Sequence, residues 1–252
     1  MRIVVKVGSA VLTQDGVVAL DRMQSLVDFI AELKEKNEVI LVSSGAVSAG
    51  YTLLALDRSI IQNKQALASL GQPVLMNKYT KKFSKYNLLC SQVLVTSANL
   101  NKSEDTKRIK NTIDILLTNN IIPIVNENDA TSTDELEVGD NDRLSAYIAQ
   151  QTDSDLLIIL SDINAYYDKD PRIHKDAKIL KVVNKISEEE LSREATPNNV
   201  FATGGIVTKL KAADYLLKHD KKMFLASGFD LSDIKSFTLN ATHSGGTLFT
   251  KA

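Results

Sequence analysis

Acidic side chains are concentrated in the segment between Asn126 and Ala146. The segment follows the apolar run Ile121–Val125, which predicts a short buried strand. Between Asn126 and Asp142 it contains no lysine or arginine. The carboxylates in this range are Glu127, Asp129, Asp134, Glu135, Glu137, Asp140 and Asp142. A block of like charge is usually solvated, and the middle of the segment fits that interpretation. Its two ends do not, because one lies where a strand ends and the other where a helix begins.

The position of these two ends predicts a ligand site, since open α/β sheets bind ligands at the carboxyl ends of their strands. So many carboxylates require cations from a metal or from elsewhere in the chain. Two lysines beside glycine turns are candidates. Lys6 ends the first strand-like run, just before Gly8-Ser9, and Lys209 opens a helix after Thr203-Gly204-Gly205.

Both glycine turns could hold a phosphate, because backbone N–H groups point outward where such a turn leads into a helix. Neither turn has the GxxxxGK[ST] spacing of a P-loop, and the chain has no GxGxxG. P-loop and Rossmann dinucleotide sites are therefore excluded by spacing. Taken singly, each lysine is more often a surface residue, and neither looks like part of the core.

The elements that must position these residues are short apolar runs separated by helical patterns. The runs are unbroken rather than alternating, which favours a mostly parallel sheet covered on both faces. Strands are predicted at Arg2–Val7, Val39–Val42, Leu88–Val95, Ile121–Val125, Leu156–Leu160 and Met223–Ala226. Helices are predicted near 21–33, 46–49, 61–70, 74–86, 103–117, 141–151 and 207–219.

Two breaks interrupt this rhythm. Gly71-Gln72-Pro73 is expected to separate the helices on either side of it. The segment Asp162–Gly205 contains Asp170-Pro171 and Thr196-Pro197, and it is expected to be rich in loops, with a short strand near Ile179–Val183. We find no internal repeat, so one domain is the simplest account.

Composition narrows the class of protein. The chain has 252 residues, 44% hydrophobic and 24% charged, which is ordinary globular usage. Its net charge of −1 gives no bias toward nucleic acid or anionic membranes. No apolar run approaches the length of a membrane span. The single cysteine, Cys90, cannot form an internal disulfide, which is consistent with a reducing compartment. We expect a cytoplasmic protein without a nucleic-acid or membrane partner.

Five segments in combination are far more specific than any one of them. They are Val4–Ser9, Val42–Val47, Asn126–Asp129, Val138–Ala146 and Thr203–Lys209. In this order they closely resemble the glutamate 5-kinase family of the amino acid kinase superfamily. The resemblance covers essentially the whole chain, and its GDND-x-LSA and TGG-x-x-TKL blocks are specific to that family.

This resemblance implies a three-layer α/β/α sandwich with a mostly parallel central sheet. Residues 1–155 would mainly hold the amino acid and residues 156–252 the nucleotide. The implied reaction is phosphoryl transfer from ATP, with Mg²⁺, to the side-chain carboxylate of L-glutamate, the first step of proline synthesis. The family is typically inhibited by proline, and a homo-oligomer is expected. Two departures stand out: the resemblance is to a short form without the C-terminal PUA domain, and Ala165 stands where the family usually has glycine.

The resemblance also assigns roles to single residues. Lys6 and Lys209 would touch the transferring phosphoryl group, with Asp142 between them as the organiser. The substrate residues would be Ser44 and Gly45 for carboxylates, Asn126 and Asp129 for the α-ammonium, and Asn141 to position a carboxylate. The nucleotide residues would be Lys6, Gly8, Ser9, Ser161, Asp162, Thr203, Gly204, Gly205, Ile206, Val207, Thr208 and Lys209. No residue is predicted to ligate a metal directly.

The chemistry explains why cations are needed. A carboxylate nucleophile has an ordinary pKa near 4.3, so it is ionised at neutral pH and needs no general base. It must instead approach a polyanion, and positive charge lowers that barrier. Three simpler roles compete: Ser44 as a helix N-cap, Asp142 as a first-turn acid and Asp162 as a turn residue.

Two other functions stay open on these residues. A related kinase could act on acetylglutamate, carbamate or a nucleoside monophosphate. A non-catalytic sensor could bind an amino acid and a nucleotide, although Lys6, Lys209 and Asp142 are all present.

Overall fold

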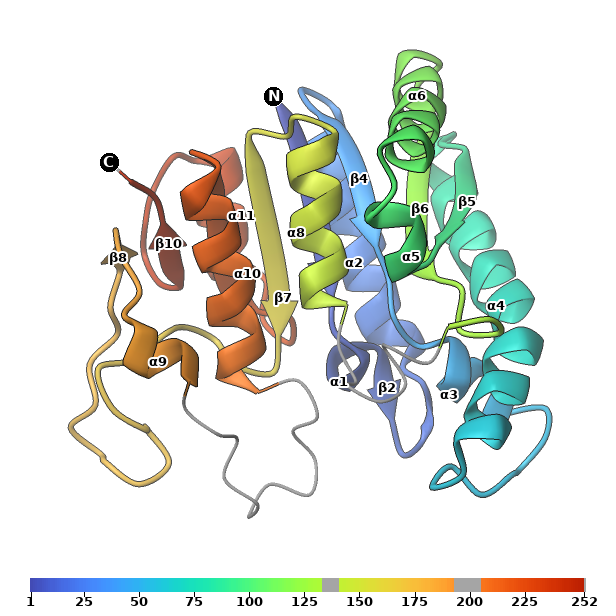
Figure 1. Ribbon diagram of the computed structural model, residues 1–252, viewed down its shortest axis with the longest axis horizontal. Coiled ribbons are helices and arrows are strands. Elements are labelled where there is room, and N and C mark those ends of the chain that lie inside the picture. Colours follow the sequence, from blue (N-terminus) through green and yellow to red (C-terminus); the bar gives the residue numbers. More distant parts are fainter. Residues whose placement is uncertain (133–140, 193–204, 252) are drawn as a thin grey trace.

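The computed structural model describes residues 1–132, 141–192 and 205–251. Its centre is an eight-stranded sheet in the order β5-β6-β4-β1-β7-β9-β10-β8 (Figure 1). Six strands form a continuous parallel block: β5 (Cys90–Val95), β6 (Ile122–Glu127), β4 (Glu38–Val42), β1 (Arg2–Val7), β7 (Leu156–Ser161) and β9 (Lys222–Ser227). β10 (Thr247–Phe249) runs antiparallel to β9, and β8 (Val182–Val183) is parallel to β10. The expectation of a mostly parallel sheet is confirmed.

Helices cover both faces of this sheet, giving the expected three layers (Figure 1). One face packs against α1 (Ser9–Leu12), α2 (Leu20–Lys34), α3 (Ala46–Tyr51), α4 (Ile61–Phe83) and α11 (Ser232–Leu239). The other packs against α5 (Ser97–Leu100), α6 (Ser103–Thr118), α8 (Asp142–Gln151), α9 (Glu188–Ser192) and α10 (Ile206–Lys218).

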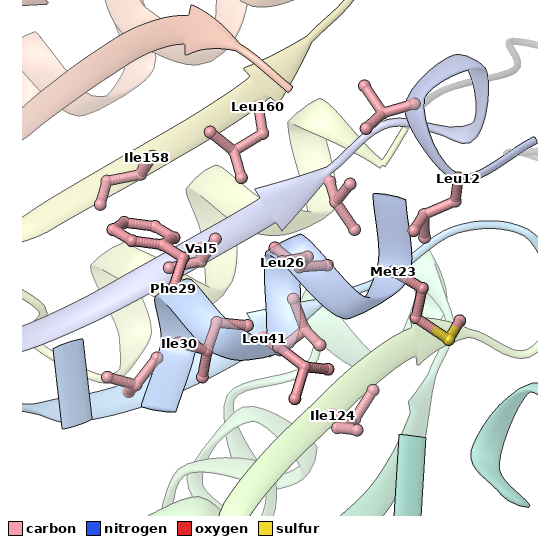
Figure 2. Packing of buried hydrophobic residues seen from close by; sticks show 14 of the residues in the cluster. Val5, Leu12, Met23, Leu26, Phe29, Ile30, Leu41, Ile124, Ile158 and Leu160 are labelled. Atoms are coloured by element: carbon pink, nitrogen blue, oxygen red, sulfur yellow. The ribbon is translucent and has the colours of Figure 1, made fainter. Parts of the chain in front are cut away.

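Burial on both faces explains why the strands are apolar without alternation. In β1, Val5 belongs to the core on the α2 side, whereas Val4 belongs to the core on the α8 side. Met23, Leu26 and Phe29 recur at spacings of three on α2 and pack onto the sheet in the same core cluster as Val5 (Figure 2). An amphipathic helix of this kind buries one stripe and leaves the other solvated.

The strand β1 lies between β4 and β7, so it is the centre of the molecule. Its Lys6 is paired in register with Val42 of β4 and Ile159 of β7. The chain first builds the β4 side of β1 and then crosses to the β7 side. Such a reversal of strand order is where open α/β sheets bind ligands, at the carboxyl ends of the strands.

One predicted break is wrong. The helix α4 runs without interruption from Ile61 to Phe83, with Pro73 inside it. Proline removes one hydrogen bond and clashes with the carbonyl four residues earlier, at a cost of about 3 kcal/mol. Buried side chains on both sides of it, including Leu67 and Tyr79, hold the helix together because their burial offsets that cost.

The glycine beside this proline has a packing role. A Cβ added at Gly71 would lie 1.8 Å from the carbonyl oxygen of Ala46 in α3, and one added at Gly50 would lie 1.9 Å from that of Leu67 in α4. The two helices therefore cross with their backbones in contact, and Gly71 marks this crossing rather than a helix end.

Several short elements were not predicted: α1, α5, α9, α11 and the hairpin of β2 (Thr13–Gln14) and β3 (Val17–Val18). The 3-10 turn η1 (Ser84–Tyr86) lies at the end of the helical stretch predicted at 74–86. The loop-rich segment contains β8, as expected near Ile179–Val183, followed by the short α9. Within the described residues, none of the helices combines the length and apolar character that crossing a membrane requires.

The crossing of α3 and α4 predicts that Gly71→Ala destabilises the protein. Alanine favours a helix by about 1 kcal/mol over glycine, but its Cβ would overlap the Ala46 backbone. We expect a net loss of about 1–3 kcal/mol in the free energy of unfolding, measured by urea denaturation. Leu70→Ala, at the exposed neighbouring position, should cost much less. A Gly71→Ala variant as stable as the wild type would show that the helices can move apart.

Candidate active site

The carboxylate of Asp142 joins two lysines that are far apart in sequence. Its Oδ1 lies 2.6 Å from Lys6 Nζ, and its Oδ2 lies 3.1 Å from Lys209 Nζ. The hydroxyl of Thr208 donates to the same Oδ2 at 2.9 Å. One carboxylate thus holds two ammonium groups close to each other, at the carboxyl end of the central strand.

Three elements position this cluster. Lys6 is the last residue but one of β1, Asp142 is the first residue of α8, and Lys209 lies in the first turn of α10. The hydroxyl of Ser145, one turn into α8, donates to the Asp142 carbonyl at 2.7 Å. Because Asp142 lies in the first turn, the α8 dipole also favours its negative charge.

The expectation that neither lysine belongs to the core is wrong. Lys6 is 1% exposed, Lys209 3% and Asp142 0%. Burying a charge is costly unless it is paired, and removing one member of a buried pair is strongly destabilising. The apolar stems of the two lysines can pack inside the protein because Asp142 pairs with both ammonium groups and offsets part of their charge.

Next to Asp142, the amide of Asn141 is held by β4 and β6. Its Nδ2 donates to the Ser43 carbonyl at 3.0 Å, to Ser44 Oγ at 3.3 Å and to Asn126 Oδ1 at 2.9 Å. Its Oδ1 is buried and has no hydrogen-bond partner among the described residues. The donor end of Asn141 is therefore committed to the protein, while its acceptor end is not.

The chain turns sharply after Ser44. Gly45 has a φ of 103°, in the left-handed region that favours glycine, and it precedes the first residue of α3. On the β4 side, the Ser43 hydroxyl lies 2.8 Å from the buried Tyr79 hydroxyl of α4. Both serines are buried, so the end of β4 is a fixed platform rather than a loop.

A cavity of about 250 Å³ lies beside this platform, between α4 and the ends of β5 and β6. Its polar lining includes Gln72, Gln92, Glu127 and Asp129. Oδ1 of Asp129 is buried without a hydrogen-bond partner among the described residues. Burial, and secondly the charge of Glu127, raises the pKa of Asp129 to about 7. A cationic ligand would relieve both effects.

A wider depression of about 710 Å³ lies at the opposite edge of the sheet, around Arg2, Asn37 and Asp155. It lies at the amino ends of β1 and β4. Since the charged cluster lies at the carboxyl ends, this larger hollow does not belong to the same site.

The residues predicted to face the nucleotide lie on the β7 side of β1, across that strand from the cavity beside Asp129. Gly8 donates its N–H to the Leu160 carbonyl at 3.1 Å, which joins the end of β1 to β7. Ser161, the last residue of β7, donates to Asp162 Oδ1 at 2.9 Å. Gly205 is the N-cap of α10, and Ile206, Val207 and Thr208 form its first turn, while Ser9 begins α1.

Some predicted residues lie outside the described part of the chain. They are Thr203 and Gly204 of the glycine turn, and Asp134, Glu135, Glu137 and Asp140 of the acidic segment. Sequence reasoning in turn missed the polar contacts of Gln72, Ser43 and Tyr79. A buried polar residue has no pattern of its own in a sequence, and Gln72 was hidden in a predicted helix break.

A comparison with protein families matches residues 1–227 to the amino acid kinase family. The chain belongs to the amino acid kinase family. The similar curated proteins are glutamate 5-kinases. That of Wolinella succinogenes is 53% identical, with 98% of this chain and 97% of the relative aligned. That of Leishmania donovani is 51% identical, with 98% of this chain and 94% of the relative aligned. That of Helicobacter hepaticus is 46% identical, with 100% of this chain and 95% of the relative aligned.

Solved structures support the family's fold. An isopentenyl phosphate kinase superposes with a TM-score of 0.69 at 15% identity, covering 99% of this chain and 100% of its own. A UMP kinase from Ureaplasma parvum superposes with a TM-score of 0.65 at 15% identity, covering 100% of this chain and 99% of its own. At such identities the likeness concerns the fold alone.

The bridged cluster predicts the effect of removing each lysine. Lys6→Ala and Lys209→Ala should lower the kcat of the phosphoryl transfer by about 100-fold or more, because each removes a preorganised positive charge. Lys211→Ala, which changes an exposed lysine of the same helix, is the matched control and should keep its activity. Normal kcat in either buried-lysine variant, measured by steady-state kinetics, would remove that lysine from the mechanism.

The buried Asp129 predicts a dependence of stability on pH. Its pKa is raised from 3.8 to about 7 in the folded protein, so between these values only the unfolded chain gives up the proton. Stability therefore falls as the pH rises through this window and is fully reduced above pH 7. Asp129→Asn should raise the free energy of unfolding at pH 8 by on the order of 1–3 kcal/mol, with little gain near pH 4. Equal gains at both pH values in urea denaturation would contradict this account.

Proposed function

We propose that the chain transfers a phosphoryl group from ATP to the side-chain carboxylate of L-glutamate, forming L-glutamyl 5-phosphate, the first step of proline biosynthesis. The observation that carries the proposal is the Asp142 carboxylate bridging the buried Lys6 and Lys209. The similarity to glutamate 5-kinases over nearly the full length supports the choice of substrate.

In this reaction a glutamate carboxylate oxygen forms a bond to the γ-phosphorus, and the bond from that phosphorus to the β–γ bridging oxygen breaks, releasing ADP. In the transition state, negative charge is spread over the oxygens of the transferring phosphoryl group. Lys6 and Lys209 would stabilise that charge from the positions in which Asp142 holds them. No side chain has to remove a proton, because the nucleophile is already ionised at neutral pH.

The substrate would bind between the cluster and the cavity. Its α-ammonium would pair with Asp129, supplying a partner that the buried Oδ1 lacks within the described part of the chain. Asn126, whose Oδ1 already accepts from Asn141 and from the Glu127 N–H, would assist at this end by shaping the site, and the Ser44-Gly45 junction would hold a carboxylate. Pairing with an ammonium favours the ionised form of Asp129 and so offsets the cost of its burial.

The nucleotide would bind across β1, against Gly8, Ser9, Ser161, Asp162 and the start of α10. Residues 1–155 would then serve the amino acid and residues 156–252 the nucleotide. Among the described residues, no three carboxylate, histidine or cysteine side chains are grouped to hold a metal ion. Mg²⁺ would instead be bound chiefly by nucleotide phosphates and water, as is usual, and it would neutralise phosphate charge there.

The other kinases of this fold are the alternative. The solved UMP and isopentenyl phosphate kinases share the architecture, yet the relatives at 46–53% identity are glutamate 5-kinases. A non-catalytic sensor would not need two buried lysines at the cost of desolvating both. Both observations favour catalysis on glutamate.

Three expectations from the sequence stay proposals. We propose that proline inhibits the enzyme, that it works as a homo-oligomer and that it is cytoplasmic. Proline has an α-carboxylate and a charged nitrogen, as glutamate has, but no side-chain carboxylate. Asp129, Asn126 and the Ser44-Gly45 junction could therefore hold either molecule.

The activity is tested with ATP, Mg²⁺ and a panel of acids, trapping any acyl phosphate with hydroxylamine. We expect hydroxamate from L-glutamate. Turnover of acetylglutamate or UMP with none of glutamate would reject the assignment.

The shared site predicts competition between proline and glutamate. Initial rates against glutamate at several proline concentrations should show competitive inhibition in the wild type. Asp129→Asn should raise the glutamate KM and the proline inhibition constant together, since both ligands would lose the same carboxylate. Noncompetitive inhibition, or none at all, would place the effector elsewhere.

A further inference from the structure

Gln72 is a buried polar side chain for which the proposed chemistry gives no role. It lies in the middle of α4, is 8% exposed and lines the cavity beside Asp129. Its Oε1 accepts from Asn126 Nδ2 at 3.0 Å, and its Nε2 donates to Gln92 Oε1 at 3.1 Å. Asn126 in turn accepts from Asn141. These four residues, Gln92, Gln72, Asn126 and Asn141, form an amide chain from β5 to the start of α8.

The direction of this amide chain is fixed by two backbone groups. The Ser43 carbonyl can only accept, so the amide group of Asn141 that faces it must be the NH₂. The Glu127 N–H can only donate, so Asn126 must turn its Oδ1 toward it, at 3.0 Å. The same Asn126 Oδ1 also accepts a hydrogen bond from the Asn141 NH₂. Exchanging oxygen and nitrogen in either amide would therefore oppose like groups.

The remaining links follow from this orientation. With its oxygen turned to Asn141, Asn126 presents its NH₂ to α4 and needs an acceptor there. Gln72 Oε1 is that acceptor. Gln72 is held in place because the adjacent Gly71 packs against the Ala46 backbone, so α4 cannot withdraw from the sheet without opening that contact. A buried NH₂ without an acceptor would cost about 1–3 kcal/mol.

We propose that Gln72 is a positioning residue for the phosphoryl-transfer site. By accepting from Asn126 it keeps the Asn126 oxygen directed at Asn141, and so fixes the Asn141 amide next to Asp142. The committed NH₂ of Asn141 leaves its Oδ1 as the atom available to an N–H donor of the bound acid. The amide chain thereby links the cavity wall to the residue that precedes the lysine-bridging carboxylate.

The inference rests on the proposed function only where substrate is used as a readout, so the experiment includes one readout without substrate. Protein labelled with [¹⁵N]asparagine gives side-chain NH₂ signals for Asn126 and Asn141, assigned through single variants at each position. Gln72→Met keeps the size of the side chain and removes the acceptor. We expect the NH₂ signals of both asparagines to shift, because loss of the first link releases the second.

Two comparisons isolate the acceptor. Gln72→Glu still accepts from Asn126, so the Asn141 signals should stay close to those of the wild type. Gln62→Met makes the same change as Gln72→Met at an exposed position of α4 and should leave both signals unmoved. If Gln72→Met does not fold, Gln72→Asn withdraws the acceptor by one methylene while keeping the polarity, and the same shifts are expected from it.

Kinetics give the second readout. Loss of one buried hydrogen bond predicts a rise in the glutamate KM on the order of tenfold in Gln72→Met, with a smaller change in kcat. Unshifted Asn141 signals would overturn the inference, as would shifts of equal size in Gln72→Met and Gln72→Glu. A wild type that does not phosphorylate glutamate, with the predicted shifts present, would reject the proposed function and leave the positioning role standing.

Discussion

The site depends on one electrostatic arrangement, the carboxylate of Asp142 between two buried ammonium groups. The ammonium groups of Lys6 and Lys209 repel each other, and burying both side chains costs desolvation free energy. The carboxylate compensates this cost only if β1, α8 and α10 meet at the right distance, since a misplaced charge in a dry interior is strongly destabilising. One anion thus ties together the geometry of three elements, although Lys6 and Lys209 lie 136 and 67 residues from Asp142 along the chain.

The parallel sheet makes this meeting possible. Its strands bring their carboxyl ends to one edge, so the ends of β1, β4, β6 and β7 converge although the chain visits them at widely spaced positions. Helix α4 adds the second constraint, because the backbone contact at Gly71 fixes its distance from α3. Through Gln72 and Asn126 that helix also reaches Asn141. The contacts that pack α4 onto the molecule therefore also position the residues of the site.

The sequence predicted the sheet and the central cluster, because unbroken apolar runs and glycine turns carry local signals. Lys6, Asp142 and Lys209 were found together only through their combined order along the chain. Their burial was not predictable, since a lysine looks like a surface residue until its partner is placed. Gly71 and Pro73 are typical of a helix break. Helix packing overrode that signal, and Gln72 between them was therefore missed.

The central claim is that Asp142 holds the charges of both lysines, and charge-neutralising variants test it through stability alone. Asp142→Asn leaves two buried ammonium groups without that carboxylate and should lower the free energy of unfolding by about 3–5 kcal/mol. Adding Lys6→Met and Lys209→Met removes those charges, and the triple variant should regain most of the loss. Urea denaturation of the three proteins at pH 7 provides the measurement. Asp142→Asn as stable as the wild type, or a triple variant no more stable than Asp142→Asn, would contradict the claim.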